Sequence, residues 1–136
     1  MRDERGAVTA FVACFAVALI AVFGLVVDGG LILASRRQAF NAADSAARAG
    51  AQAVDESALR SGQPLRLDDA EARTRALDFL EAAGLEGSVN VAGDRISVSV
   101  TTTRELNVLG FAGIGPIGIH ATGSARAVQA VREEGD

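Results

Sequence analysis

The chain has 136 residues and a formal net charge of −4, and 49% of its residues are hydrophobic although only 4% are aromatic. A chain of this length holds one small domain. Its acidic balance leaves no basic stripe with interleaved aromatic residues, which excludes nucleic acid as a partner. Cys14 is the only cysteine, so an intrachain disulfide is excluded as well.

The first predicted element is a membrane-spanning helix. Residues 7–27 form a run of 21 uncharged, mostly apolar residues, and such a helix rises about 30 Å, the thickness of a bilayer's hydrocarbon core. A cleavable secretory signal is the competing interpretation, but its apolar region usually spans only about 7–15 residues. We therefore interpret residues 7–34 as a retained transmembrane segment with its interfacial end, and residues 1–6 as a cytoplasmic tail or leader.

Asp28 directly follows the apolar run, and we interpret it as a membrane-end carboxylate. A carboxylate in this place either reaches the membrane interface, which is the commoner arrangement, or pairs with an arginine of a partner protein. Positive charge alone slightly favours an orientation in which the residues after the run are cytoplasmic, because more arginines follow the run than precede it. The short amino-terminal tail is a weak determinant, so charge does not settle the orientation.

An alanine-rich helix is predicted to extend past the membrane over residues 35–60. Small residues recur along it at spacings of three and four, and such a face lets another backbone approach closely. This helix docking face consists of Ala43, Ala46, Ala47, Gly50 and Ala51. It packs either on the sheet of the chain's own domain or against another subunit.

Residues 61–132 are predicted to form a small α+β domain. Ser61–Pro64 is a predicted loop, and Asp68 with Glu71 three residues later resembles a capping box at the start of a helix. Apolar residues then recur at helical spacing, and Gly84 is the predicted stop.

A β-hairpin is predicted next, with Gly93 and Asp94 as a two-residue turn and glycine at its first central position. In that register Val91 lies opposite Ile96, and Val89 lies opposite Val98. All five branched residues then share one face of the sheet, namely Val89, Val91, Ile96, Val98 and Val100.

Residues 106–118 are too apolar for an ordinary solvated loop, because Leu109, Phe111 and Ile114 lie among glycines there. This apolar contact loop either covers the end of the sheet or contacts lipid or a neighbouring subunit. From Ile117 a third strand is predicted, whose inward residues are small enough for a helix to pack closely across it. The acidic residues 133–136 are predicted to be disordered.

No pattern in the sequence indicates catalysis, a metal or a cofactor. His120 and Cys14 are the only residues of their kinds, and no metal-ligand spacing, phosphate-binding glycine loop or nucleophile elbow is present. Asp68 and Asp69 are better explained by helix capping than by acid–base chemistry. We therefore expect a protein that is not an enzyme.

Three segments together resemble the amino-terminal region of TadE/TadG-like pilus-assembly proteins of the tight-adherence, Flp-type system: Arg5–Phe11, Val27–Gly30 and Asn41–Ala51. The resemblance implies a minor pilin-like or accessory component of the pilus or a related secretion machinery. It further implies an amino terminus in the cytoplasm and a globular part outside the cytoplasmic membrane. The partners would be the lipid bilayer, pilins, membrane platform proteins and further copies of the chain.

In pilin-like relatives the leader is cut after a glycine, which here is Gly6, with Ala7 as the new amino terminus. Those relatives also carry a glutamate within the apolar run, and no glutamate lies between Ala7 and Val27 in this chain. We therefore favour an uncleaved, TadG-like membrane component. The alternative function is a membrane-tethered extracytoplasmic ligand-binding or sensory domain, which requires a pocket in this small core.

Overall fold

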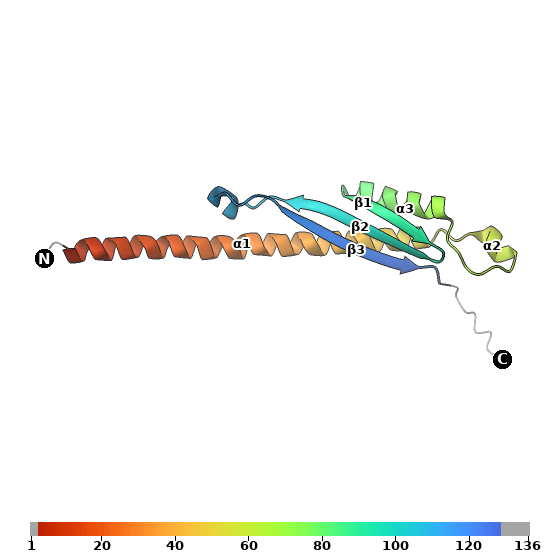
Figure 1. Cartoon of the computed structure of the whole chain (residues 1–136), viewed down its shortest axis with the longest axis horizontal. Coiled ribbons are helices and arrows are strands. Elements are labelled where there is room, and N and C mark those ends of the chain that lie inside the picture. Colours follow the sequence, from red (N-terminus) through yellow and green to blue (C-terminus); the bar gives the residue numbers. More distant parts are fainter. Residues whose placement is uncertain (1–2, 129–136) are drawn as a thin grey trace, which may run out of the picture. The chain divides into compact units, whose positions relative to one another are not determined.

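A computed structural model describes residues 3–128 of the chain (Figure 1). Its elements in chain order are helix α1 (Asp3–Ala51), helix α2 (Glu56–Arg60), helix α3 (Asp69–Ala82), strand β1 (Glu86–Ala92), strand β2 (Arg95–Arg104), the 3₁₀ turn η1 (Leu109–Ala112) and strand β3 (Ile117–Arg126). The strands form one antiparallel sheet in the order β1-β2-β3. The predicted α+β class, with a long amino-terminal helix and a three-stranded sheet, is confirmed.

Two compact units make up the structure. Within the described residues, the first contains residues 3–35 together with Thr103–Ile117, and the second contains Arg36–Thr102 together with residues 118–128. The loop predicted at 106–118 therefore groups with the first part of α1, whereas we had assigned it to the small domain. The acidic tail predicted at 133–136 lies outside the described residues.

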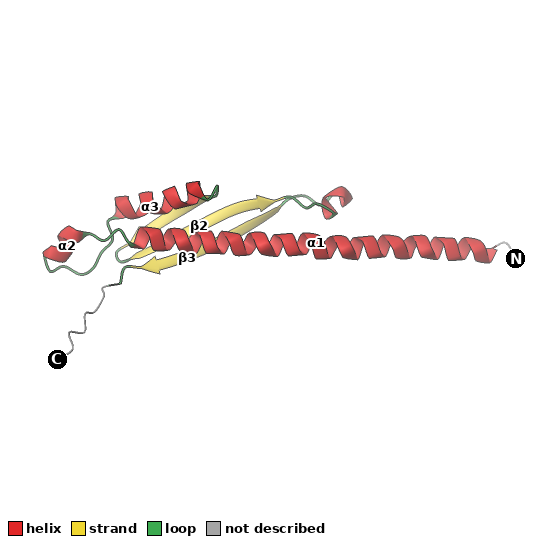
Figure 2. Cartoon of the chain, turned by 180° about the vertical axis from the view of Figure 1, so that it is seen from behind, coloured by secondary structure: helices red, strands yellow, loops and turns green. Residues whose placement is uncertain are grey.

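The hydrophobic core belongs to the second unit and lies on one face of the sheet. It is built from the later part of α1, from α3 and from the inward residues of all three strands (Figure 2). The core contains many alanines and only a few larger residues; Leu80, Ile96, Val98 and Val100 are the largest apolar side chains that are fully buried. Helices rich in alanine pack close to a sheet, which explains how so few large side chains fill the space.

The helix predicted over residues 35–60 is interrupted, so that part of the prediction is wrong. Helix α1 ends at Ala51, and the separate helix α2 begins at Glu56. Asp55 starts α2, because its carboxylate accepts hydrogen bonds from the amides of Ser57 and Ala58, both at 3.0 Å. Between the two helices Val54 forms an isolated antiparallel bridge with Leu67. The segment therefore turns back instead of continuing as one helix.

Helix α3 begins and ends where the sequence predicts. The Asp68 carboxylate accepts a hydrogen bond from the Glu71 amide at 3.0 Å. The reciprocal bond of a capping box is absent, since the Asp68 amide donates to the Ala53 carbonyl and Glu71 pairs with Arg75. Gly84 follows the helix with φ +67°, and the Leu85 amide donates to the Leu80 carbonyl, as in a Schellman motif.

Removing the cap of α3 is expected to lower the free energy of unfolding of the second unit. Asp68→Ala leaves the Glu71 amide without its acceptor, and losing such a cap costs about 1 kcal/mol. The matched control is Asp78→Ala in the same helix, which caps nothing and is expected to change stability by less than about 0.5 kcal/mol. Denaturant titration of the full chain followed by circular dichroism would measure both; equal midpoints would contradict the capping role.

The hairpin has the predicted register. Val91 pairs with Ile96, Val89 pairs with Val98, and Ala92 pairs with Arg95. Gly93 has φ +64° at the first central position of the turn, whereas Asp94 has no positive φ, which fits a type II′ turn. The five branched residues face the core, and four of them are buried.

Strand β3 lies against α1 at the position where the small residues were predicted. Ile119, Ala121 and Gly123 are buried and alternate with exposed His120, Thr122 and Ser124. A Cβ atom on Gly123 would lie 2.5 Å from the Ala43 carbonyl carbon and 2.7 Å from its oxygen. Glycine is therefore required there, because the helix backbone occupies the space of a side chain.

Candidate functional site

The predicted anchor is an exposed apolar surface on the first half of α1. Its large side chains have no core to pack against; Phe11 is 70% exposed and Phe23 is 68% exposed. Within residues 3–128, α1 is the one helix long and apolar enough to cross a membrane by length and composition. A helix in a soluble core would bury such residues, so this exposure favours a lipid environment.

Asp28 is the polar centre of the first unit. It is 1% exposed, and its carboxylate accepts hydrogen bonds from three consecutive amides of the segment after β2. Asn107 donates to Oδ1 at 3.0 Å, Val108 donates to Oδ1 at 3.2 Å and to Oδ2 at 3.0 Å, and Leu109 donates to Oδ2 at 2.7 Å. Both carboxylate oxygens are thereby satisfied by backbone.

These three amides lead into the 3₁₀ turn η1. The residue before that turn, Val108, occupies its N-cap position and makes no side-chain cap hydrogen bond. Asp28 supplies the acceptor from about 80 residues away in the chain, and a carboxylate at the amino end of a helical turn is favoured by the exposed amide dipoles. The acceptor sites of Asp28 are occupied within the chain, which argues against the pairing with a partner's arginine that we weighed, whereas its interfacial position stays a prediction.

Two further residues on the same face of α1 hold this segment. Gly24 is buried one helical turn before Asp28, and a Cβ atom there would lie 2.5 Å from Cγ1 of Val108. Ser35 is buried two turns after Asp28, and its hydroxyl accepts a hydrogen bond from Nε of Arg104 at 2.8 Å. The roles of Gly24, Ser35 and Arg104 are not predicted from the sequence. The available signal was the placement of Gly24, Asp28 and Ser35 at intervals of four and seven, on one face of a helix.

The apolar contact loop is fixed at its base and exposed at its tip. Leu109 is partly buried beside Asp28, whereas Phe111 is 96% exposed and Ile114 is 49% exposed. The hydrogen bonds of the base go to α1, and the expectation that the loop covers the end of the sheet stays a prediction. The other expectation, an exposed apolar contact, matches the position of Phe111.

Part of the chain, including this region of α1, matches a known protein family. Residues 6–53 match the family described as Putative Flp pilus-assembly TadE/G-like. This segment is similar to that family. The resemblance inferred from the sequence is thereby confirmed over these residues. Neither the curated proteins nor the solved structures gave a significant match.

The TadE/G-like segment includes the helix docking face, and the structure shows what covers it. Ala43, Ala46 and Ala47 are fully buried in the core, Gly50 is buried, and Ala51 is partly buried. A Cβ atom on Gly50 would lie 2.7 Å from the Ala72 carbonyl oxygen. The chain's own sheet and α3 therefore occupy this face, and it is not open to a second subunit.

Gly6 and Ala7, at the start of the TadE/G-like segment, both lie inside α1. Residues 1–6 are predicted as a tail or leader before the helix, whereas the helix begins at Asp3. A Cβ atom on Gly6 would meet nothing within 4 Å, so packing does not require glycine at this position. Cleavage after Gly6 stays a prediction that the fold does not test.

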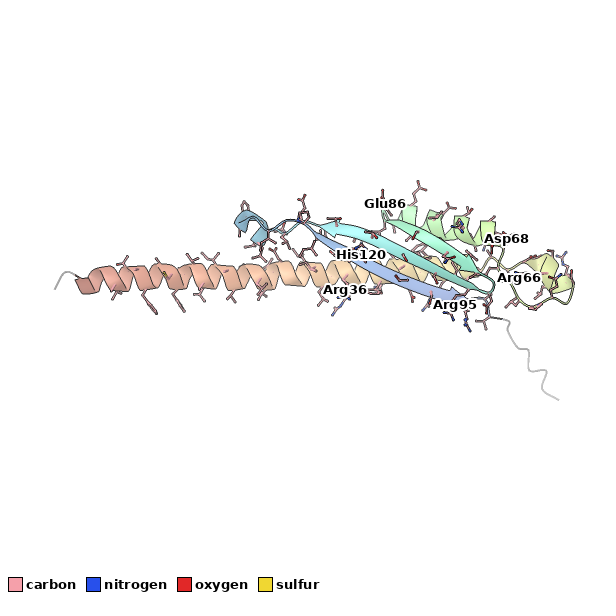
Figure 3. The ribbon with its side chains drawn as sticks, in the orientation of Figure 1. Arg36, Arg66, Asp68, Glu86, Arg95 and His120 are labelled. Atoms are coloured by element: carbon pink, nitrogen blue, oxygen red, sulfur yellow. The ribbon has the colours of Figure 1, made fainter. Side chains whose placement is uncertain are left out.

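A shallow depression of about 350 Å³ lies in the second unit and bears on the alternative ligand-binding function. It is lined by Asp55, Ala58, Gln63, Arg66, Leu67, Asp68, Asp69, Ala70 and Gly93; Figure 3 labels two of these residues, Arg66 and Asp68. The hydroxyl of Ser57 and the amide of Ala58 hold the pKa of Asp55 below its ordinary value. The carboxylates of Asp55 and Asp68 already cap α2 and α3, and most of the lining residues are exposed. The described residues contain no group of three metal-ligating side chains.

Proposed function

We propose that the chain is a membrane-anchored accessory or minor pilin-like component of a tight-adherence pilus or a related secretion machinery, and that it acts by protein–protein contacts and not as an enzyme. The supporting observation is that one segment both matches a pilus-assembly family and contains the candidate membrane anchor. Residues 6–53 match a pilus-assembly family, and the same residues contain the exposed apolar run of α1.

In this proposal the amino terminus is cytoplasmic and the sheet lies outside the cytoplasmic membrane. Pilins and membrane platform proteins are the proposed partners. Because the helix docking face is covered by the chain's own sheet, these partners are proposed to contact the exposed surfaces. One of these is the polar face of the sheet, where Thr101, His120 and Thr122 are exposed. Homo-oligomers would form through the same exposed surfaces.

A matched pair of arginine substitutions tests the anchor. Leu19→Arg places a charge near the middle of the apolar run, where it costs about 2.5–3.5 kcal/mol of membrane insertion. The fraction of protein that resists alkaline carbonate extraction is expected to fall. Leu59→Arg, at an exposed position of α2, is expected to leave that fraction unchanged. Wild-type protein in the carbonate-soluble fraction would contradict membrane anchoring.

Co-purification tests the partners. Full-length protein with a carboxyl-terminal tag, extracted from its native membrane in mild detergent, is expected to bring pilus proteins with it. Intact-mass analysis of the same sample shows whether the chain retains Met1 or begins at Ala7. Recovery of a stoichiometric small molecule without protein partners would contradict the proposal and favour the ligand-binding alternative.

A further inference from the structure

The base of the apolar contact loop lies beside the last turns of the apolar run. Val108 packs on Gly24, which is inside the run of residues 7–27, and the next amides bind Asp28 at its end. The loop is therefore attached to α1 at the level where the proposed membrane segment ends. Its position on the helix is fixed by a van der Waals contact and by hydrogen bonds from three amides.

The composition of the loop suits contact with lipid. Residues 106–119 contain no charged side chain, and the two most apolar side chains at its tip, Phe111 and Ile114, are exposed. Phe111 is 96% exposed and Ile114 is 49% exposed. Aromatic residues are favoured at the boundary between lipid headgroups and acyl chains.

Six backbone amides of this segment meet a requirement of an apolar environment. Amide groups that enter lipid need hydrogen-bond acceptors within the protein. Asp28 accepts from the amides of residues 107, 108 and 109, and carbonyl groups of the loop accept from those of residues 111, 113 and 114. The loop thus satisfies these donors without water.

We propose that residues 108–114 form a second membrane contact, in which Phe111 and Ile114 enter the interfacial layer of the bilayer next to the anchor while Asp28 fixes the base of the loop. The inference rests on the proposed membrane anchoring. Lipid is the occupant, and not a second copy of the chain, because the loop is continuous with the helix surface that the bilayer covers. Burial of Phe111 then requires no partner protein.

Tryptophan fluorescence tests this directly, because the chain contains no tryptophan and no tyrosine. Phe111→Trp changes a fully exposed side chain and leaves the core untouched. The full-length variant is reconstituted in vesicles of phosphatidylethanolamine and phosphatidylglycerol that contain lipids brominated either near the headgroup or near the chain end. Phe15→Trp in the anchor is the positive control, and Phe79→Trp on the exposed surface of α3 is the control for the second unit.

We expect blue-shifted emission from Phe111→Trp, with greater loss of intensity when the bromines are near the headgroup. Phe15→Trp is expected to lose more intensity with the deep bromines, and Phe79→Trp is expected to lose little with either. Quenching at Phe15→Trp but not at Phe111→Trp would overturn the loop contact and leave the anchor intact. Absence of quenching at both would overturn the anchoring as well, and equal quenching at Phe79→Trp would show that the signal is not specific to the loop.

Discussion

Asp28→Ala is expected to release the base of the apolar contact loop from α1. The substitution removes the acceptor of three amides at once, and hydrogen bonds to a charged group are worth about 1.5–3 kcal/mol each. Because the freed amides can turn toward water, we expect the loss of these hydrogen bonds to cause local opening of the loop and not unfolding of the core. If the free energy of local opening falls by about 3 kcal/mol, the amides of residues 107–109 exchange with solvent deuterium roughly a hundred-fold faster.

Hydrogen exchange of the full chain in lipid nanodiscs, read by mass spectrometry, measures this effect. Asp44→Ala is the matched control, because Asp44 is an aspartate of the same helix that forms only an exposed ion pair with Arg48, at 3.4 Å. Such pairs contribute little, so exchange at 107–109 should not change. Unaltered exchange of these amides in Asp28→Ala would show that the carboxylate does not hold the loop.

Features that depend on neighbouring residues could be predicted from the sequence more readily than features that depend on residues far apart in the chain. The hairpin could be predicted with its register because the alternation of branched residues and the glycine at position 93 independently require the same pairing. Likewise, Asp68 and Gly84 act on amides and carbonyls within a few residues, so the limits of α3 follow from local chemistry.

The role of Asp28 could not be predicted in this way, because its partners lie about 80 residues further along the chain. The sequence shows a carboxylate at the end of an apolar run, and that pattern fits an interfacial position equally well. The break between α1 and α2 was missed for a different reason. Alanine-rich spacing favours a continuous helix, whereas the bridge between Val54 and Leu67 and the cap at Asp55 redirect the chain.

Gly123→Ala is expected to separate α1 from β3 and to destabilise the second unit. The added Cβ would lie 2.5–2.7 Å from the carbonyl of Ala43 and would also meet the amide nitrogen of Asp44. These are backbone atoms of a helix, so they cannot rotate away as a side chain does. Overpacking of this kind costs about 1–3 kcal/mol, which corresponds to a fall in Tm on the order of 10 °C for a domain of this size.

Gly118→Ala on the same strand is the matched control for that effect. A Cβ atom there would meet only Nε2 of His120, at 3.8 Å, an ordinary contact. Because alanine loses less backbone entropy than glycine on folding, this variant should be neutral or slightly more stable than the wild type. Thermal unfolding of both full-length variants in nanodiscs gives the difference directly. Since the same entropic gain also acts in Gly123→Ala, equal Tm values would mean that the helix does not pack on β3 at Gly123.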